Sequence, residues 1–212
     1  SPLSSFASEL GLPFVQQLEN PHVIQTSQCR VGVFGAGPSG YELSSAYHKR
    51  ELEETKADLG NSLVNFARIV PQGMLVFFPS YSALQAAHAA WQARGSGGTP
   101  SIIERLRKLK QVVVEPRDGS QLSACVDEYM GAVKGRGGVL LAVCRGKLAE
   151  GIDFSDAACR AVIITGLPLP PIFDAQVKLK RDFLDDRRRR GGAGAAHCLS
   201  GELWYHQQAM RA

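Results

Sequence analysis

No stretch of this 212-residue sequence is apolar over the length that a membrane span requires, and no secretory signal is visible at its start. The sequence also contains no C-x-x-C pair. Its five cysteines are scattered: Cys29, Cys125, Cys144, Cys159 and Cys198. An odd, dispersed set of cysteines in a chain of this length indicates reduced thiols in an intracellular compartment.

Metal-ligand spacing is absent as well, so we expect structural roles for the histidines. They are His22, His48, His88, His197 and His206. With 44% hydrophobic and 21% charged residues, the composition is that of an ordinary globular protein, and the net charge of +4 permits an anionic partner without requiring one. The length favours a single domain over residues 1–212. Because the chain begins with Ser-Pro-Leu and not with Met, we expect it to be a fragment.

Apolar runs rich in β-branched residues alternate along the chain with helical patterns. The runs predict strands over Val31–Phe34, Met74–Phe78, Val112–Val114, Val139–Val143 and Ala161–Thr165. The helical patterns cover Ser44–Ile69, Ser82–Arg94, Ser101–Lys110, Leu122–Val133, Asp174–Asp186 and Gly201–Arg211. This alternation predicts an α/β fold whose mostly parallel sheet has helices on both faces. Two Gly-rich stretches, Gly95–Pro100 and Arg187–Ala196, are predicted to be surface loops.

The most informative segment is Gly138–Phe154. Its apolar run, Val139–Val143, is typical of a strand that is buried on both faces. A short polar turn with two cations, two acids and two glycines follows, and the next apolar run, Ala161–Thr165, is also predicted to be buried. Ligands of open parallel sheets bind just beyond the carboxyl ends of the strands. The turn therefore lies where a nucleotide or a phosphate backbone would bind.

The residue types in this turn suit an anionic ligand. Arg145 and Lys147 are placed to meet phosphates, while Gly146 and Gly151 let the backbone approach an anion closely. Asp153 offers an acceptor for a ribose hydroxyl. The alternative interpretation is a solvated loop in which Glu150 pairs with Lys147.

A second candidate contact follows the run Met74–Phe78. Pro79-Ser80-Tyr81 brings a hydroxyl, a backbone amide and an aromatic ring to the end of a strand, and these groups suit the phosphates and a stacked base of a nucleic acid strand. The simpler interpretation is a helix N-cap formed by Ser80 or Ser82, and both roles are compatible in one residue.

Two glycine motifs superficially resemble nucleotide-binding loops. Gly35–Gly40 fits G-x-G-x-x-G, but Pro38 sits inside the turn and no acid ends the next apolar run, so a plain glycine loop is favoured. Gly146-Lys147 is followed by Leu148, where a P-loop needs Ser or Thr. No acidic box of the DEAH type occurs, so the chain is predicted not to hold a triphosphate and metal by itself.

Two further features are open to more than one interpretation. The basic run Arg187–Arg190 fits either a nucleic acid contact or a solvated loop. Trp91, Trp204 and Tyr205 fit helix faces, and core or interdomain packing is their default role.

Several motifs in a fixed order resemble one family. The run AVCRGKLAEGIDFSD, residues 142–156, is similar to motif V of the iron–sulfur branch of superfamily 2 DNA helicases, and GMLVFFPSYSAL, residues 73–84, is similar to its motif IV. The resemblance continues through LENPHVIQ, VVVEPR, VIITGLPLPP, LKRDFLDD, GGAG and SGELWYHQQAMRA. It covers nearly the whole chain, and it points to members of the branch that regulate telomeres.

The resemblance implies the second RecA-like motor domain of an ATP-dependent helicase that moves 5′ to 3′ and acts in telomere maintenance and DNA repair in the nucleus. Glu150, Gly151 and Asp153 are then expected in the ATP cleft. Ser80, Tyr81, Arg145 and Lys147 are expected to hold single-stranded DNA. Implied partners are single-stranded, branched or looped DNA and the first motor domain, with no membrane.

The resemblance also implies cofactors that other parts of such a protein hold. ATP and Mg²⁺ are expected to bind mainly to the first motor domain, which also carries a 4Fe–4S cluster in this branch. The chain is expected to stop before motif VI, so it is predicted to be inactive alone. Two alternatives stay open: a catalytically inert interaction domain derived from a helicase, and a doubly wound dinucleotide-binding enzyme.

Overall fold

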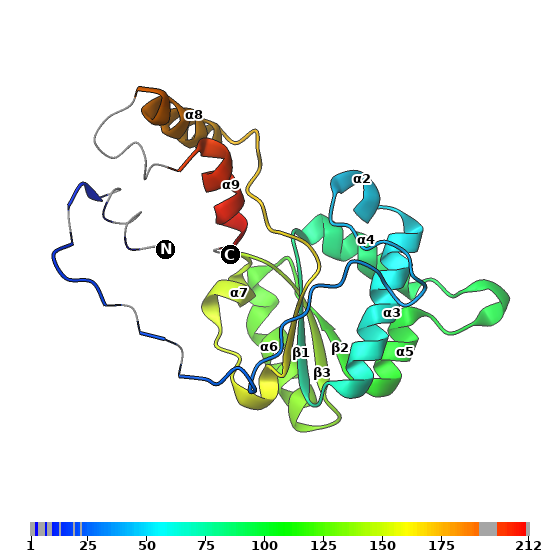
Figure 1. Ribbon diagram of the computed structural model, residues 1–212. Helices are drawn as coiled ribbons and strands as arrows, with labels where there is room; N and C mark the ends of the chain where they lie inside the picture. Colours follow the sequence, from blue (N-terminus) through cyan, green and yellow to red (C-terminus); the bar gives the residue numbers. More distant parts are fainter. Residues whose placement is uncertain are drawn as a thin grey trace. The chain divides into compact units, whose positions relative to one another are not determined.

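A four-stranded sheet organises the chain. The computed structural model describes residues 3, 7, 10–12, 14–18, 20–21, 23–190 and 199–210. The strands are β1 (Gly73–Phe78), β2 (Gln111–Val114), β3 (Gly138–Val143) and β4 (Ala161–Ile164). They lie in the order β2-β3-β1-β4, and every neighbouring pair is parallel (Figure 1). The parallel α/β sheet predicted from the sequence is confirmed.

Helices and short 3-10 turns connect the strands. The α-helices of this part of the chain are α2 (Tyr47–Arg50), α3 (Glu53–Ile69), α4 (Tyr81–Gln92), α5 (Ile102–Leu109), α6 (Leu122–Lys134) and α7 (Lys147–Gly151). The 3-10 turns are η1 (Ser96–Gly98), η2 (Gly119–Gln121) and η3 (Asp156–Ala158). Most bounds fall within one or two residues of the predicted helices, because the 3.6-residue period of the apolar positions is clear in each.

The sheet is covered on both faces, as predicted. Alternate strand residues point to opposite faces. One set, which includes Val76 and Leu141, packs with α3, α4 and α5, and the other, which includes Leu75 and Leu140, packs with α6, α7 and η3. Trp91 has the core role expected for it, since it is fully buried and donates from Nε1 to the carbonyl of Lys56 over 2.7 Å.

Burial separates the central strands from the edge. All six residues of β3 are buried because strands flank it on both sides and helices cover both faces. β4 lies at the edge, and Val162 and Ile164 are 52% and 62% exposed. The predicted burial of Ala161–Thr165 is therefore wrong, because one face of β4 is exposed and the other is only half-buried. An apolar edge strand and an apolar central strand have similar sequences. What distinguishes them is whether a strand pairs on one side or on both, and the pairing strands come from other segments of the chain.

Three further predictions need correction. Val31–Phe34 forms no strand, because a β-branched run forms a strand only where the edge of a sheet pairs with it. Phe34 instead packs edge-on against Phe66. The predicted helix over Ser44–Ile69 is broken at Leu52, whose backbone is extended. The predicted loop over Arg187–Ala196 is wrong for Arg187–Arg190, which form the last turn of a helix, where cations favour the carboxyl end of the helix dipole; the rest of that prediction lies outside the described residues.

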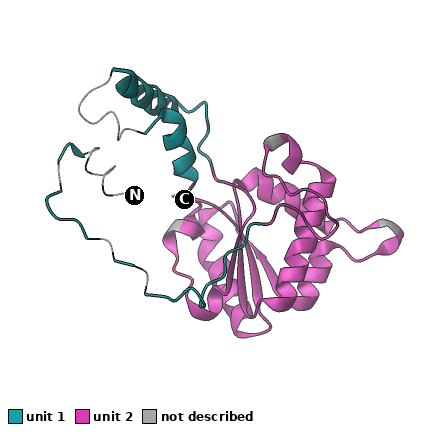
Figure 2. Cartoon of the chain, in the orientation of Figure 1, with its two compact units in different colours: residues 1–33, 169–212 teal, residues 34–168 magenta. Residues whose placement is uncertain are grey.

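The chain divides into two compact units (Figure 2). The sheet and its helices belong to residues 34–168, and the other unit comprises residues 1–33 and 169–212. This second unit contains α8 (Ala175–Arg190) and α9 (Gly201–Met210). The Tyr205 hydroxyl donates to the carbonyl of Pro170 over 2.8 Å, and the Arg181 guanidinium lies over its ring.

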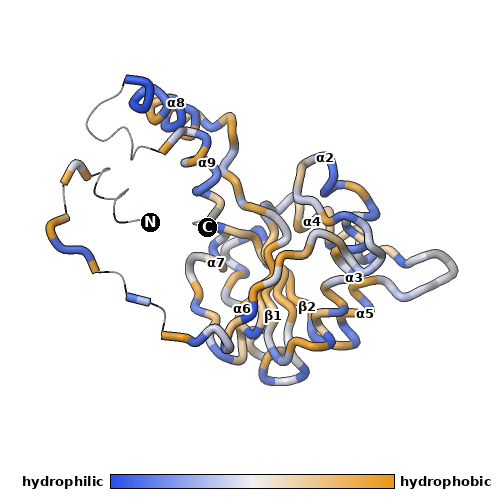
Figure 3. The backbone as a smooth tube through the Cα atoms, viewed as in Figure 1, coloured by the Kyte–Doolittle hydropathy of each residue, from blue (hydrophilic) through white to orange (hydrophobic). Residues whose placement is uncertain are grey.

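Hydropathy varies along the backbone of both units (Figure 3). The central strands are strongly apolar, whereas α8 is mostly hydrophilic. Within α8, Asp186 pairs with Arg190 over 2.6 Å, one helical turn away. None of the helices in the described ranges combines the length and the apolar character needed to cross a membrane.

The glycine loop at Gly35–Gly40 lacks the context of a dinucleotide site. In the continuously described segment 23–190, no strand precedes it and no helix begins at Gly40. Instead the loop is fixed to α3, because the Asp58 carboxylate accepts from the Ser39 hydroxyl over 2.8 Å. A Cβ built on Gly37 would lie 2.4 Å from Asp58 Oδ2, so the loop needs glycine for close packing. The interpretation as a plain glycine loop holds.

Candidate functional site

Three loops meet at the carboxyl edge of the sheet, one after each of β1, β2 and β3. The strands are parallel neighbours, so their carboxyl ends lie side by side. Backbone hydrogen bonds extend the pairing past the strands: Cys144 donates to the carbonyl of Phe78 over 2.8 Å, and Glu115 donates to that of Leu141 over 2.9 Å. The predicted site residues of the first and third loops therefore share one edge.

The loop after β3 begins with a tight turn. Arg145 is in the left-handed region, with φ of 57°, and the amide of Gly146 donates back to the carbonyl of Val143 over 3.1 Å. A Cβ on Gly146 would lie 2.9 Å from both that carbonyl oxygen and Oε1 of Glu115. Gly146 is thus required by close packing inside the turn, which brings its backbone near the edge where an anion would approach.

Apolar anchors hold this loop while its polar residues face solvent. Leu148 is fully buried, and the Phe154 ring packs edge-on against Tyr129 with ring centroids 5.6 Å apart. Arg145, Lys147 and Asp153 are exposed, as is Gly151. The sequence alternates between residues that contact the core and residues that are available to a ligand. The predicted side-chain role of Glu150 lies outside the described residues.

Lys147 lies beside the loop that follows β2. A Cβ built on Gly119 would be 2.5 Å from Lys147 Nζ, so the ammonium packs directly on that backbone. Nearby, two hydrogen bonds from Ser120 lower the pKa of Asp118, and the charge of Lys147 lowers it further. A negative group therefore lies close to Lys147, which is nevertheless an exposed residue at the edge of the sheet.

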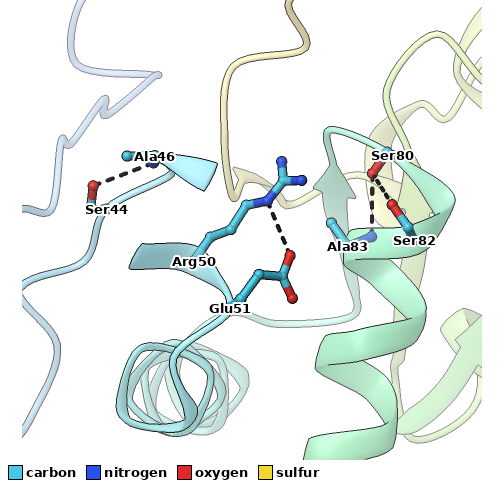
Figure 4. Close-up of polar contacts among 7 residues, drawn as sticks. All are labelled: Ser44, Ala46, Arg50, Glu51, Ser80, Ser82 and Ala83. Atoms are coloured by element: carbon cyan, nitrogen blue, oxygen red, sulfur yellow. Dashed lines mark hydrogen bonds and ion pairs between the residues drawn. The ribbon is translucent and has the colours of Figure 1, made fainter. Parts of the chain in front are cut away.

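The loop after β1 confirms the N-cap interpretation of Ser80. Its Oγ accepts from the amide of Ala83 over 3.2 Å and lies 2.9 Å from the hydroxyl of Ser82 (Figure 4). Ser80 is half-buried and still borders the solvent. Its second predicted role, a contact with a nucleic acid strand, stays a prediction.

Tyr81 is more constrained than the sequence indicates. Its hydroxyl donates to Oε1 of Glu115 over 2.8 Å, and the Arg117 guanidinium lies 5.9 Å from the centre of its ring. Burial raises the pKa of Tyr81 to about 12, and the hydrogen bond and charge of Glu115 act in the same direction. The phenol is neutral at physiological pH, so it contributes a hydroxyl and a ring but no charge.

Sequence reasoning missed two residues of this edge, Glu115 and Arg117. Glu115 is only 3% exposed, and its carboxylate accepts from the Tyr81 hydroxyl and from the amide of Val143, the latter over 2.7 Å. Arg117 is exposed and adds a third cation to those of Arg145 and Lys147. The sequence signal that could have identified them is an acid and a base directly after the apolar run Val112–Val114. The candidate residues of the other two loops were selected because they follow apolar runs in the same way.

The family model described as "Helicase C-terminal domain" matches residues 63–212, which include the whole sheet and all three loops. The chain belongs to this family. The regulator of telomere elongation helicase 1 of Mus musculus is 48% identical over 215 residues, a match that covers all of this chain. The Homo sapiens protein of the same name is 46% identical, and the Arabidopsis thaliana homologue is 45% identical, each again over all of this chain.

These relatives are much longer than the chain, which spans 17% of the length of the mouse and human proteins and 21% of the Arabidopsis homologue. A solved structure described as an XPD helicase is 27% identical, with a TM-score of 0.43, over 65% of this chain and 21% of that one. The four parallel strands with helices on both faces agree with the RecA-like α/β architecture that the motifs imply.

The four cysteines in the described part of the chain differ in burial. Cys125 is buried, Cys144 and Cys159 are half-buried, and Cys29 is exposed, while Cys198 lies outside the described residues. Among the residues that the structure describes, no group of three or more His, Cys, Asp or Glu side chains is arranged to hold a metal ion.

Proposed function

We propose that the chain is the C-terminal motor domain of an ATP-dependent DNA helicase that moves 5′ to 3′ along its strand. Family membership supports a helicase motor domain. The names of the relatives support a role in telomere maintenance, and we extend this to DNA repair and to the nucleus. The full activity belongs to the longer protein, and we expect the 212 residues to hydrolyse no ATP alone, because they contain neither a P-loop nor an acidic box.

The DNA grip is proposed at the carboxyl edge of the sheet. The observation that carries this proposal is the set of exposed cations at this edge: Arg145 and Lys147 follow β3, and Arg117, which follows β2, lies over the ring of Tyr81. Cations neutralise phosphates, and aromatic rings stack with bases of any sequence. Ser80 supplies a hydroxyl at the positive end of α4, which favours a phosphate further.

The same loop after β3 is proposed to form one wall of the ATP cleft. Asp153 is exposed, and no hydrogen bond or ion pair ties its carboxylate to the part of the chain that the structure describes. A carboxylate in that state suits a ribose hydroxyl of ATP, and Gly151 has open space where a side chain would be. When bound, ATP supplies the free energy of translocation. Branched or looped DNA and the first motor domain are the proposed partners of the whole protein.

Fluorescence anisotropy of a labelled single-stranded oligonucleotide, measured over a salt series, tests the DNA grip. Wild-type chain should bind weakly, with an affinity that falls as salt rises. The Arg145→Ala/Lys147→Ala variant should lose affinity, and the slope of log K against log salt should decrease by about 1.4 if each side chain meets one phosphate of a single strand.

A matched control removes two exposed cations from the opposite edge of the sheet. Arg68 lies in the last turn of α3, before β1, and Lys134 is the last residue of α6, before β3. The Arg68→Ala/Lys134→Ala variant loses two positive charges, as the test variant does. It should bind nearly as wild type does. Equal losses in the two variants would mean that DNA responds to net charge alone, and the proposed grip would be wrong.

A further inference from the structure

A buried carboxylate connects the two loops of the proposed grip. Glu115 lies one residue past β2, and β3 lies between β2 and β1 in the sheet. One oxygen of Glu115 accepts from the Tyr81 hydroxyl over 2.8 Å, and the other accepts from the Val143 amide over 2.7 Å. The side chain therefore spans the end of β3 and reaches the first residue of α4.

The turn that carries the two cations packs on this same carboxylate. Gly146 follows Arg145 and precedes Lys147, and a Cβ on Gly146 would lie 2.9 Å from Glu115 Oε1. The turn opens at Val143, whose amide donates to Glu115 and whose carbonyl accepts from Gly146. The amide and the carbonyl of Val143, which define the start of the turn, are thus both hydrogen-bonded. Glu115 is the side chain that accepts from the amide.

The burial of Glu115 makes this arrangement specific. Glu115 is 3% exposed, and among the described residues its carboxylate has no ion-pair partner within 4 Å. A buried carboxylate needs hydrogen-bond donors that replace its lost hydration. The Tyr81 hydroxyl and the Val143 amide are those donors, so moving either loop away from Glu115 leaves the carboxylate with one donor.

We infer that Glu115 is a positioning residue that holds Tyr81 and the Arg145–Lys147 turn in one fixed arrangement. The two loops then meet a DNA strand as a single preorganised surface, which avoids the cost of ordering each loop on binding. For its consequence on DNA the inference rests on the proposed function, but the coupling between the loops is a property of the chain itself.

Four variants of the 212-residue chain test the DNA consequence. Glu115→Ala should weaken single-strand binding on the order of tenfold at low salt and reduce the salt slope by about 0.7 for each phosphate that the chain no longer neutralises. Glu115→Gln should restore most of the affinity, because the amide oxygen still accepts from Val143 and the amide nitrogen can donate to the Tyr81 oxygen. Tyr81→Phe should cause a smaller loss, and Glu115→Ala/Tyr81→Phe should bind no worse than Glu115→Ala, since both changes remove one shared hydrogen bond.

Two results of the binding series would overturn the inference. If the folded Glu115→Ala variant binds as tightly as wild type or more tightly, the carboxylate acts only as a negative charge that repels DNA. If the effects of Glu115→Ala and Tyr81→Phe add in full, the two residues do not work through each other.

A second readout does not depend on DNA. In the ¹H–¹⁵N spectrum, Tyr81→Phe should shift the amide resonances of Val143 and Gly146, although these residues belong to another loop. Tyr129→Phe is the matched control, because the Tyr129 hydroxyl is also buried and donates to the carbonyl of Ala158, near the amino ends of β1 and β3. The control should leave the amide resonances of Val143 and Gly146 unshifted.

The two readouts separate the inference from the proposed function. If wild-type chain binds no DNA while Tyr81→Phe shifts the amides of Val143 and Gly146, the DNA grip is refuted and the coupling through Glu115 stands. If those amides do not move, the coupling is refuted, whatever the chain binds. Should Glu115→Ala fail to fold, Tyr81→Phe and Glu115→Gln decide the question in the same way.

Discussion

The anchor of the loop after β3 gives the sharpest prediction about how the site is built. Leu148 is fully buried in the cluster beneath α7, whereas its neighbours Lys147 and Ala149 are exposed. α7 has five residues, far fewer than an isolated helix needs to persist in water. We therefore predict that Leu148→Ala weakens both the fold and the proposed grip, since this side chain fixes the helix that follows the cationic turn.

The size of the effect follows from the burial. Truncating a fully buried leucine to alanine costs the transfer free energy of the removed carbons plus a cavity term, about 3 kcal/mol at a site with no exposed surface. If α7 unfolds locally and the chain collapses into the cavity, the measured loss of unfolding free energy falls toward the lower end of the usual range. The cationic turn then loses its support. Either response should lower single-strand affinity under conditions in which the chain stays folded.

Urea unfolding followed by circular dichroism measures the loss of stability. Fluorescence anisotropy in buffer without urea measures the loss of DNA affinity. Leu106→Ala is the matched control, because Leu106 is equally buried but belongs to the cluster on the opposite face of the sheet. It should cost a similar free energy of unfolding and leave the DNA affinity of the folded chain unchanged. A Leu148→Ala variant that loses less than about 1 kcal/mol and binds DNA normally would refute the reasoning.

Three further predictions concern single residues of the carboxyl edge. Gly146→Ala should cost about 1–3 kcal/mol of stability by urea unfolding, because the new methyl would meet Glu115 and the Val143 carbonyl at 2.9 Å; unchanged stability would contradict the packing argument. Since the pKa of Tyr81 is raised to about 12 from an ordinary value of about 10, its contribution to stability should be complete below pH 10 and disappear as the pH rises to about 12. The measurement is a titration of phenolate absorbance in wild type and in Tyr81→Phe. If the substitution removes no group that ionises at high pH, the prediction is wrong. Asp153→Ala should leave the circular dichroism spectrum intact while it weakens the coupling of ATP turnover to DNA in the longer protein, and unfolding would show that Asp153 is structural.

The fold was largely accessible from the sequence. Parallel strands with both faces covered are continuous apolar runs, so β1, β2 and β3 were predicted at nearly their observed bounds. The helices between them showed a clear 3.6-residue period. The prediction failed where local pattern and tertiary partner disagree: the run at Val31–Phe34 has the composition of a strand, but no strand edge in the described structure pairs with it.

The site was only partly accessible, for a related reason. The exposed residues of the loops after β1 and β3 could be selected because they follow buried strands directly. The role of Glu115 could not, since it depends on a hydroxyl 34 positions earlier and an amide 28 positions later. A carboxylate after an apolar run is indistinguishable in sequence from a solvated turn residue. Only the sheet order, which places β3 between β2 and β1, brings these three groups together.

The central claim is that the carboxyl edge of the sheet holds single-stranded DNA, and mapping the binding surface tests it most directly. Uniformly ¹⁵N-labelled chain would be titrated with a short oligo-dT strand while the amide resonances are followed. We predict that the shifting amides cluster in residues 80–82, 115–119 and 144–148, and that those at the amino edge, residues 72–73 and 136–138, stay in place. Shifts concentrated at the amino edge, or spread over the surface without relation to the three loops, would contradict the claim.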